Sequence, residues 1–396
     1  MRHILRLAML CPLWLLPGPT AQAQPDPNLA MNNPDQFAWE MFMVVNAPAG
    51  GTNAVFETWA SDTDTFNMAP AFPTGPTPLV LHPPVVTAAG RQALQRSGHL
   101  LPAIPPGILQ GVSEESRRNQ RAFDFIKNNN LYKVSGLKAA FGSTLSFPSD
   151  AIEVKANWIS INNVPNWTNN RVSVADAPKF FHINAAKDGS KFALVAMHVI
   201  TKQVPNWTWA TFESEFNPGR CDIIGCSDKF GASAPVPPNK TTGQIYPPCV
   251  ATPALSALFA KAKLDAAFTH YCLKGSQADF TDNAGLDVRL GNSVTEAGFV
   301  DQSSCMACHG RAAFDKTGHD NPPGAAGFDS HGAPLGPTSP TIYWKYTGKP
   351  PQPFYPFVAG GPGLTQVMTS ADFVWSIPFC AADDTVSPAK LRCQGK

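Results

Sequence analysis

The residues with the clearest chemical potential are Cys305, Cys308 and His309, which form a Cys-x-x-Cys-His motif. Two thiols separated by two residues can add to the two vinyl groups of one haem, and the adjacent imidazole then binds the iron. The thioether bonds keep the porphyrin attached even where the surrounding protein loosens. The motif therefore predicts one covalently bound haem c, with His309 as the proximal iron ligand.

Three other uses of this motif are less consistent with the sequence. A zinc site needs four ligands, and there is no second nearby Cys-x-x-Cys or His-x-x-x-His pattern. A thioredoxin-type redox pair would open a helix after a strand, whereas we expect a helix ahead of Cys305. A disulfide between Cys305 and Cys308 would be strained at this spacing.

The sixth iron ligand would decide the chemistry of such a haem. Met368 is the only methionine after Met306, and an axial thioether favours a low-spin iron suited to electron transfer. Met368 could equally fill a gap in the core. His198 is the second candidate, because a period-two pattern places it on the apolar face of a strand. Most such histidines are core residues whose hydrogen bonds are satisfied.

Three further residues near the motif are weaker candidates for the site. Arg311 follows the motif by two residues and could pair with a haem propionate, or it could simply be a solvated helix residue. His319 and His331 lie in the Pro- and Gly-rich stretch after the motif, where we expect them to be solvated unless a loop folds over the iron.

The segment Cys305–His309 resembles the c-type cytochromes, which implies that both cysteines are thioether anchors and His309 is the proximal ligand. Beyond it, three strings resemble a family of uncharacterised exported proteobacterial monohaem cytochrome c proteins. These strings cover residues 56–66, 205–212 and 271–277. This second resemblance covers most of the chain after residue 23, and it implies no particular reaction.

The N-terminus has the pattern of a secretory signal peptide. Arg2 and Arg6 precede an apolar stretch over residues 7–16, and Ala21-Gln-Ala23 provides a cleavage pattern. The apolar stretch is too short to span a bilayer, and no later segment approaches that length. We therefore expect export to the periplasm or the medium, with the mature chain starting at Gln24.

Cysteine usage agrees with an oxidising compartment. Eight cysteines follow the signal, and six remain if Cys305 and Cys308 hold haem: 221, 226, 249, 272, 380 and 393. These six suffice for three disulfides, which can be connected in 15 ways. Proximity along the chain favours Cys380–Cys393, with the other four pairing among themselves.

Composition narrows the class of protein. The chain has 39 Pro and 30 Gly but only 15% charged residues, which predicts a fold rich in loops. The net charge is close to zero, so no basic field is available for nucleic acid or an anionic membrane.

Local patterns predict the order of elements. A helix is expected at 34–45, where Pro34 occupies the first helical position. Further helices are expected at 114–129, at 253–274 with Gly275 after its end, and from Ser293 towards Cys305. Strands are expected at 55–60, 152–161, 179–184, 192–201 and 207–213. The motif Val-Pro-Asn-Trp-Thr occurs at 164–168 and again at 204–208, and its alignment pairs Trp158 with His198. The two segments could be neighbouring strands, or the repeat could be a coincidence.

These elements predict an α+β fold, with a loop-rich mixed sheet in the N-terminal and middle region. We expect a signal peptide at 1–23, a large N-terminal domain at 24–285, and a mostly helical or irregular haem-binding segment at 286–396. The function expected first is electron transfer with an unknown redox partner. The alternatives are a haem-dependent peroxidase or oxygenase, or a small-ligand sensor, each with an open distal iron site and a small-molecule substrate or ligand.

Overall fold

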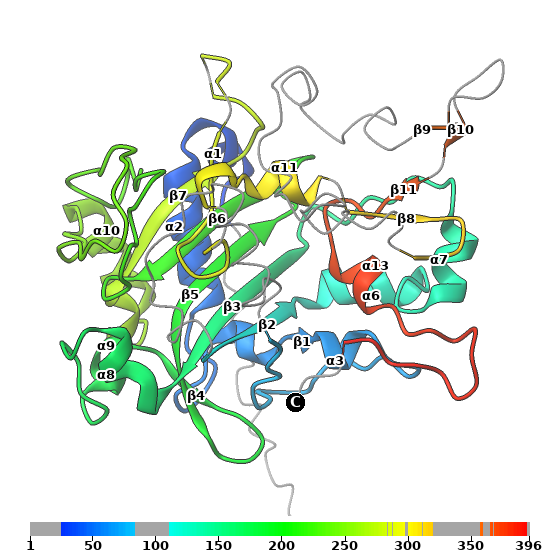
Figure 1. The fold of residues 1–396 in the computed structure, drawn as a ribbon, viewed down its shortest axis with the longest axis horizontal. Coiled ribbons are helices and arrows are strands. Elements are labelled where there is room, and N and C mark those ends of the chain that lie inside the picture. Colours follow the sequence, from blue (N-terminus) through cyan, green and yellow to red (C-terminus); the bar gives the residue numbers. More distant parts are fainter. Residues whose placement is uncertain are drawn as a thin grey trace, which may run out of the picture.

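The computed structural model describes residues 25–83 and 111–393, except 283, 287, 298–299, 311, 320–356, 359–364 and 367. The fold is α+β, as predicted, and its centre is one seven-stranded antiparallel sheet (Figure 1). The expected signal peptide, Arg311 and His331 lie outside the described residues. Among the described helices, none combines the length and the apolar character needed to cross a membrane.

The sheet has the order β1-β2-β3-β5-β6-β7, and β4 pairs with β5. Its strands are β1 (Ala60–Ser61), β2 (Val112–Arg118), β3 (Ile152–Ser160), β4 (Ile183–Ala185), β5 (Lys191–Thr201), β6 (Thr208–Ser214) and β7 (Tyr271–Gln277). The predicted strands at 152–161, 192–201 and 207–213 are confirmed as β3, β5 and β6. The predicted strand at 179–184 is only partly correct, because residues 177–180 form a helical turn before β4.

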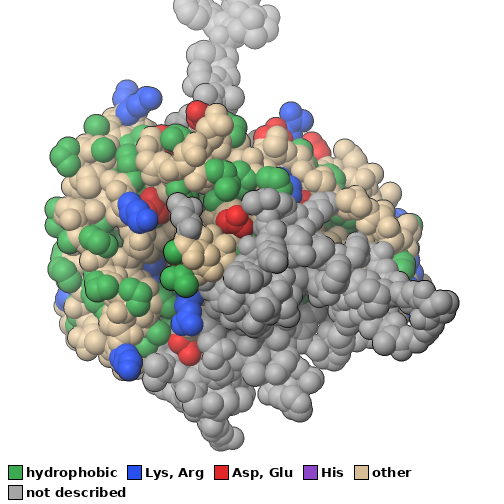
Figure 2. Space-filling view, turned by 90° about the horizontal axis from the view of Figure 1, so that it is seen from above, with side chains coloured by type: hydrophobic (Ala, Val, Ile, Leu, Met, Phe, Trp, Pro, Cys, Tyr) green, Lys and Arg blue, Asp and Glu red, His purple; other side chains and the backbone are tan. Residues whose placement is uncertain are grey.

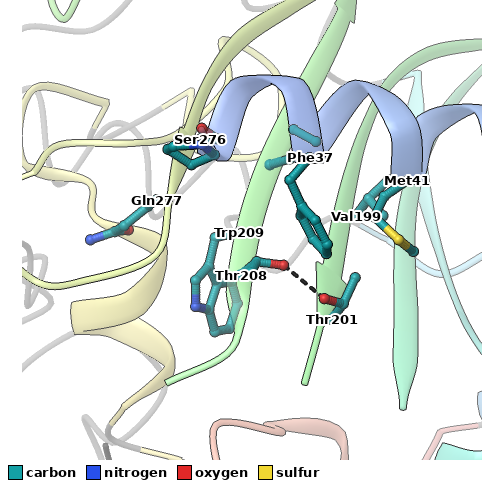
Figure 3. A pocket seen from close by; sticks show the side chains of 11 residues that line it. Phe37, Met41, Val199, Thr201, Thr208, Trp209, Ser276 and Gln277 are labelled. Atoms are coloured by element: carbon teal, nitrogen blue, oxygen red, sulfur yellow. Dashed lines mark hydrogen bonds between the residues drawn. The ribbon is translucent and has the colours of Figure 1, made fainter. Parts of the chain in front are cut away.

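One face of the sheet is apolar and packs against helix α2 (Pro34–Val45), which confirms the prediction for 34–45. Asn33 caps this helix by accepting a hydrogen bond from the Gln36 amide. Phe37 and Met41 of α2 lie over Val199 and Thr208 (Figure 3). The void between them measures only about 10 Å³, which is about the space of one water molecule. This face is therefore core.

The opposite face of the same sheet carries polar side chains. Lys155, His198 and Thr211 occupy directly paired positions on β3, β5 and β6, so they share this face. Their neighbours Val154, Val199 and Ala210 are likewise paired and face α2. Such a polar face can be exposed to water, but here it is covered by groups from the C-terminal third of the chain, including Asn292 and Glu296.

The other described elements surround this sheet. The helices are α1 (Pro27–Asn32), α3 (Asp62–Thr65), α6 (Gln120–Asn128), α7 (Val134–Ala140), α8 (Val164–Trp167), α9 (Ala177–Phe180), α10 (Pro253–Ala262), α11 (Cys305–His309) and α13 (Ser376–Cys380). The 3-10 helices are η1 (Val55–Thr58), η2 (Ile161–Asn163), η3 (Ala266–His270) and η4 (Val300–Gln302). Two small antiparallel sheets pair β8 (Ala313–Asp315) with β11 (Met368–Ser370), and β9 (Phe357–Val358) with β10 (Thr365–Gln366).

Several predicted elements are wrong because strand pairing overrides local preference. The expected helix at 114–129 begins as β2, which pairs along its whole length with β3, and only α6 is helical. The expected helix at 253–274 ends at Ala262, and Gly275 lies within β7. The predicted strand at 55–60 is mostly the 3-10 helix η1.

The expected helix from Ser293 is also absent. Asn292 rather than Ser293 caps this segment, because its Oδ1 accepts hydrogen bonds from the amides of Val294 and Thr295 at 2.9 and 2.6 Å. The chain then forms turns over 293–297 instead of a helix. Helix α11 starts at Cys305 itself.

The two repeated motifs lie after neighbouring strands, as one of the two interpretations proposed. β3 and β5 are paired antiparallel, with Trp158 opposite Leu194 and His198 opposite Lys155. The following turns also differ, because 164–167 forms helix α8 whereas Trp207 adopts a left-handed conformation with φ of 61°.

The structure contains three disulfides. Cys380–Cys393 is formed as predicted, and the other four cysteines pair among themselves as Cys221–Cys226 and Cys249–Cys272.

On the face drawn in Figure 2, the described basic side chains lie scattered among acidic and apolar ones.

Candidate haem site

Helix α11, which carries the motif, is fixed to the end of β7 by one side chain. Ser304 caps the helix with its hydroxyl, which accepts a hydrogen bond from the Ala307 amide at 3.4 Å. Gln277 of β7 accepts one from the Met306 amide at 3.2 Å and donates one to the Ser304 hydroxyl at 3.1 Å. The amides at the start of a helix have no partner within the helix. Gln277 supplies the missing acceptor and so holds the motif against the sheet.

The two cysteines of the motif form no disulfide, in contrast to the six cysteines that pair elsewhere in the described chain. The Cys305 thiol is buried and donates to the Leu290 carbonyl at 3.5 Å. Burial raises the pKa of Cys305 well above its usual value, and nearby Glu296 adds to this effect. A redox-active pair needs a lowered thiol pKa, so this environment argues against that role.

The segment before Cys305 differs from the expectation. The helix expected ahead of Cys305 is absent, and the motif opens a helix as a redox pair would. The segment before it is the 3-10 helix η4 rather than a strand. The absence of a strand directly before α11 and the raised pKa of the buried Cys305 thiol both argue against a redox pair.

His309 is held in the form that can ligate a metal. Its Nδ1–H donates to the carbonyl oxygen of Phe373 at 2.9 Å, and its ring lies 4.6 Å from the Trp209 ring. Burial lowers the pKa of His309 to about 4, so the ring is neutral at physiological pH. With the proton on Nδ1, the lone pair of Nε2 is available to a metal ion.

A cavity of about 330 Å³ opens beside the motif, and Cys305, Cys308 and His309 all line it. This volume lies within the range of cofactor and ligand sites. The apolar part of its lining includes the stacked rings of Trp375 and Phe379, whose centroids are 4.9 Å apart, and Trp209, which lies on the same face of β6 as Thr211. The Cys380–Cys393 disulfide also lines the cavity.

The other part of the cavity lining is the polar face of the sheet. Lys155 of β3 forms an ion pair with Glu114 of β2 at 2.9 Å, and both line the cavity with His198 of β5. Glu296 lies 3.5 Å from the His198 Nε2 atom. The cavity thus combines an apolar, aromatic side with a charged, hydrogen-bonded side.

Two groups face the Nε2 atom of His198. The Asn292 carbonyl accepts two backbone amides, so its amide nitrogen faces His198 and lies 3.1 Å from Nε2. The Glu296 carboxylate lies 3.5 Å from the same atom, so Nε2 is already engaged by protein groups.

Comparison of the chain with protein-family models, with curated proteins and with solved structures found no significant match. The assignment of the candidate site therefore rests on the geometry and chemistry of this chain's own residues.

The structure brings some of the predicted site residues together and separates others. Cys305, Cys308, His309 and His198 line one cavity. Met368 lies in β11, opposite Asp315 of β8, and is not among the described residues that line the cavity. His319 ends the turn after β8, where its amide faces the Asp315 carboxylate, and it does not line the cavity either.

The sequence analysis missed much of the cavity wall. Lys155 had a signal, because polar and charged residues alternate with apolar ones in β3, whereas β2 has no such alternation and its Glu114 was assigned to a helix. The turn predicted as a helix from Ser293 likewise hid Glu296. The Phe373 carbonyl has no sequence signal at all, since every residue carries one.

Proposed function

We propose that this chain is an exported monohaem c-type cytochrome that transfers electrons through haem bound at Cys305, Cys308 and His309. The observation that carries the proposal is the shared cavity. The two cysteines that form no disulfide and the neutral imidazole of His309 all line this one space of about 330 Å³. Haem bound there would supply reversible one-electron chemistry.

The residues of the chain have distinct parts in this proposal. Cys305 and Cys308 supply the thioether anchors from positions three residues apart on one helical turn, and Gln277 holds that turn in place. The Phe373 carbonyl fixes the orientation of His309. Trp209, Trp375 and Phe379 exclude water from one side, and a lower local dielectric raises the potential of a buried redox centre.

The second axial position has consequences for function. Met368 is not among the described lining residues, and Nε2 of His198 already faces the Asn292 amide nitrogen and the Glu296 carboxylate. This arrangement favours an open or weakly occupied sixth position. It supports a second candidate function, in which the protein binds a small ligand or substrate at haem iron as a sensor, peroxidase or oxygenase.

Carbon monoxide distinguishes the two functions. The visible spectrum of the reduced protein is recorded with and without carbon monoxide, for the wild type and for Met368→Leu and His198→Ala. A low-spin spectrum that carbon monoxide leaves unchanged supports the electron carrier. If Met368→Leu or His198→Ala makes the haem reactive towards carbon monoxide, the replaced residue is the sixth iron ligand. Rapid binding to the wild type supports the small-ligand function and rules out a strong sixth ligand.

Export to the periplasm or the medium is part of the proposal. The three disulfides fit an oxidising compartment, which is also where c-type haem is attached. The N-terminal pattern over residues 1–23 supplies the expected signal. The resemblance to exported proteobacterial monohaem cytochromes supports the same assignment.

A further inference from the structure

A turn of unusual backbone conformation lies against His309. Asp372 and Phe373 both have positive φ angles, of 51° and 72°. Residues other than glycine adopt this left-handed conformation at an energetic cost, because Cβ approaches the following carbonyl oxygen. The effect of this conformation here is to direct the Phe373 carbonyl at the Nδ1–H group of His309, 2.9 Å away. Such strain persists only where the surrounding structure holds it, and it is often associated with function.

The side chain of Asp372 holds this turn. Asp372 is completely buried, and its two carboxylate oxygens accept hydrogen bonds from the Lys202 ammonium and the Phe147 amide, each at 2.8 Å. Lys202 is the first residue after β5 and also donates to the Pro205 carbonyl at 2.6 Å. The pair therefore connects the strained turn to the end of a central strand of the sheet.

A buried ion pair of this kind adds little stability in general, because removing two charges from water offsets their attraction. Burial indeed lowers the pKa of Lys202, which Asp372 counteracts only in part. A positional role explains its presence better than a stabilising one.

We propose that Lys202 and Asp372 are a positioning pair that holds the Phe373 carbonyl on His309 and thereby sets how strongly this imidazole donates electrons to bound haem iron. The inference depends on the proposed function. An imidazole whose other ring N–H is hydrogen-bonded to a carbonyl is a more basic ligand with a fixed orientation. A more basic ligand stabilises oxidised iron, so loss of the pair is expected to raise the reduction potential.

The signs of the potential shifts separate positioning from simple charge effects. The test measures the reduction potential of Lys202→Met, Asp372→Asn and the double variant in the full-length protein. A pure charge effect would lower the potential when the cation is removed and raise it when the carboxylate is removed, because oxidised iron carries the additional positive charge. It would leave the double variant unchanged, since that variant has the original net charge. Positioning predicts a higher potential in all three variants.

Two controls distinguish this role from a general loss of stability. Glu215→Gln removes a largely buried carboxylate that pairs with His270 at 2.8 Å, beyond the end of β6 opposite to Trp209. It is expected to destabilise the protein without moving the potential. Lys202→Arg keeps the cation and is expected to retain the wild-type potential.

A second measurement applies whether or not the protein contains haem. Nitrogen-15 NMR of the purified chain, in the reduced state if haem is present, reports whether the His309 proton is on Nδ1. We expect this proton on Nδ1 in the wild type, with a weaker hydrogen bond or a different tautomer in Asp372→Asn. If haem is absent, the proposed function fails while the NMR result still tests the pair. Potential shifts of opposite sign in the single variants, or an unchanged Nδ1–H signal in Asp372→Asn, would overturn the inference.

Discussion

The attachment of helix α11 to the sheet gives a quantitative prediction for Gln277→Leu. In the wild type, the Gln277 carbonyl accepts from the Met306 amide at 3.2 Å and its amide donates to Ser304 at 3.1 Å. Gln277 is 2% exposed and Met306 is fully buried, so water cannot replace these bonds. Leucine fills a similar volume but offers neither group.

The expected loss follows from the two bonds. Leaving the buried Met306 amide without a partner costs about 1–3 kcal/mol, and losing the Ser304 bond adds about 1 kcal/mol. We therefore expect Gln277→Leu to lower the free energy of unfolding by about 3 kcal/mol. Because the Met306 amide in the first turn of α11 loses its acceptor, the helix should also open locally.

Urea unfolding measures the global change, and hydrogen exchange at the Cys308 and Gly310 amides measures the local one. Both amides donate within α11, to Ser304 and Met306. Gln244→Leu is the matched control, because Gln244 is exposed and should change stability by less than about 0.5 kcal/mol. The reasoning would be refuted if the two variants had the same stability, or if the α11 amides remained as protected as in the wild type.

Two further predictions concern stability away from the motif. Replacing both Cys380 and Cys393 by serine opens a loop with a sequence separation of 13. Loop-closure entropy predicts that the free energy of unfolding, measured by urea titration, falls by about 3 kcal/mol. An unchanged urea midpoint would contradict this. Burial raises the pKa of Asp228 from 3.8 to about 6, so the folded state binds a proton that the unfolded state releases. The free energy of unfolding should therefore fall by about 2 kcal/mol as the pH rises from about 4 to 6, and Asp228→Asn should lack this fall; parallel pH profiles for the two proteins would exclude it.

Some elements could be predicted because local and tertiary signals agree. Helix α2 has a capping Asn33, Pro34 at its first position and an apolar face that packs on the sheet. Strands β3 and β5 are rich in apolar and β-branched residues and lie at the centre of the sheet. In each case the pattern visible in the sequence is also what the packing requires.

Other elements could not be predicted because pairing with a distant strand decides them. The segment 112–118 contains acidic residues suited to the first turn of a helix, yet all seven residues pair with β3. The same limit applies to the site. The spacing of Cys305, Cys308 and His309 is local and was readable, whereas the cavity wall depends on strands far apart in the chain. The strained turn at Asp372 is set by its bond to Lys202, which no local pattern reveals.

The central claim is that Cys305 and Cys308 hold haem covalently, and the mass of the denatured full-length protein tests it most directly. Expressed with its own export signal in a host that attaches c-type haem, the wild type should be heavier than its processed polypeptide by one haem. Its colour should also remain with the protein in acidified acetone. A mass equal to that of the polypeptide alone, or pigment that dissolves away from the precipitated chain, would contradict the account.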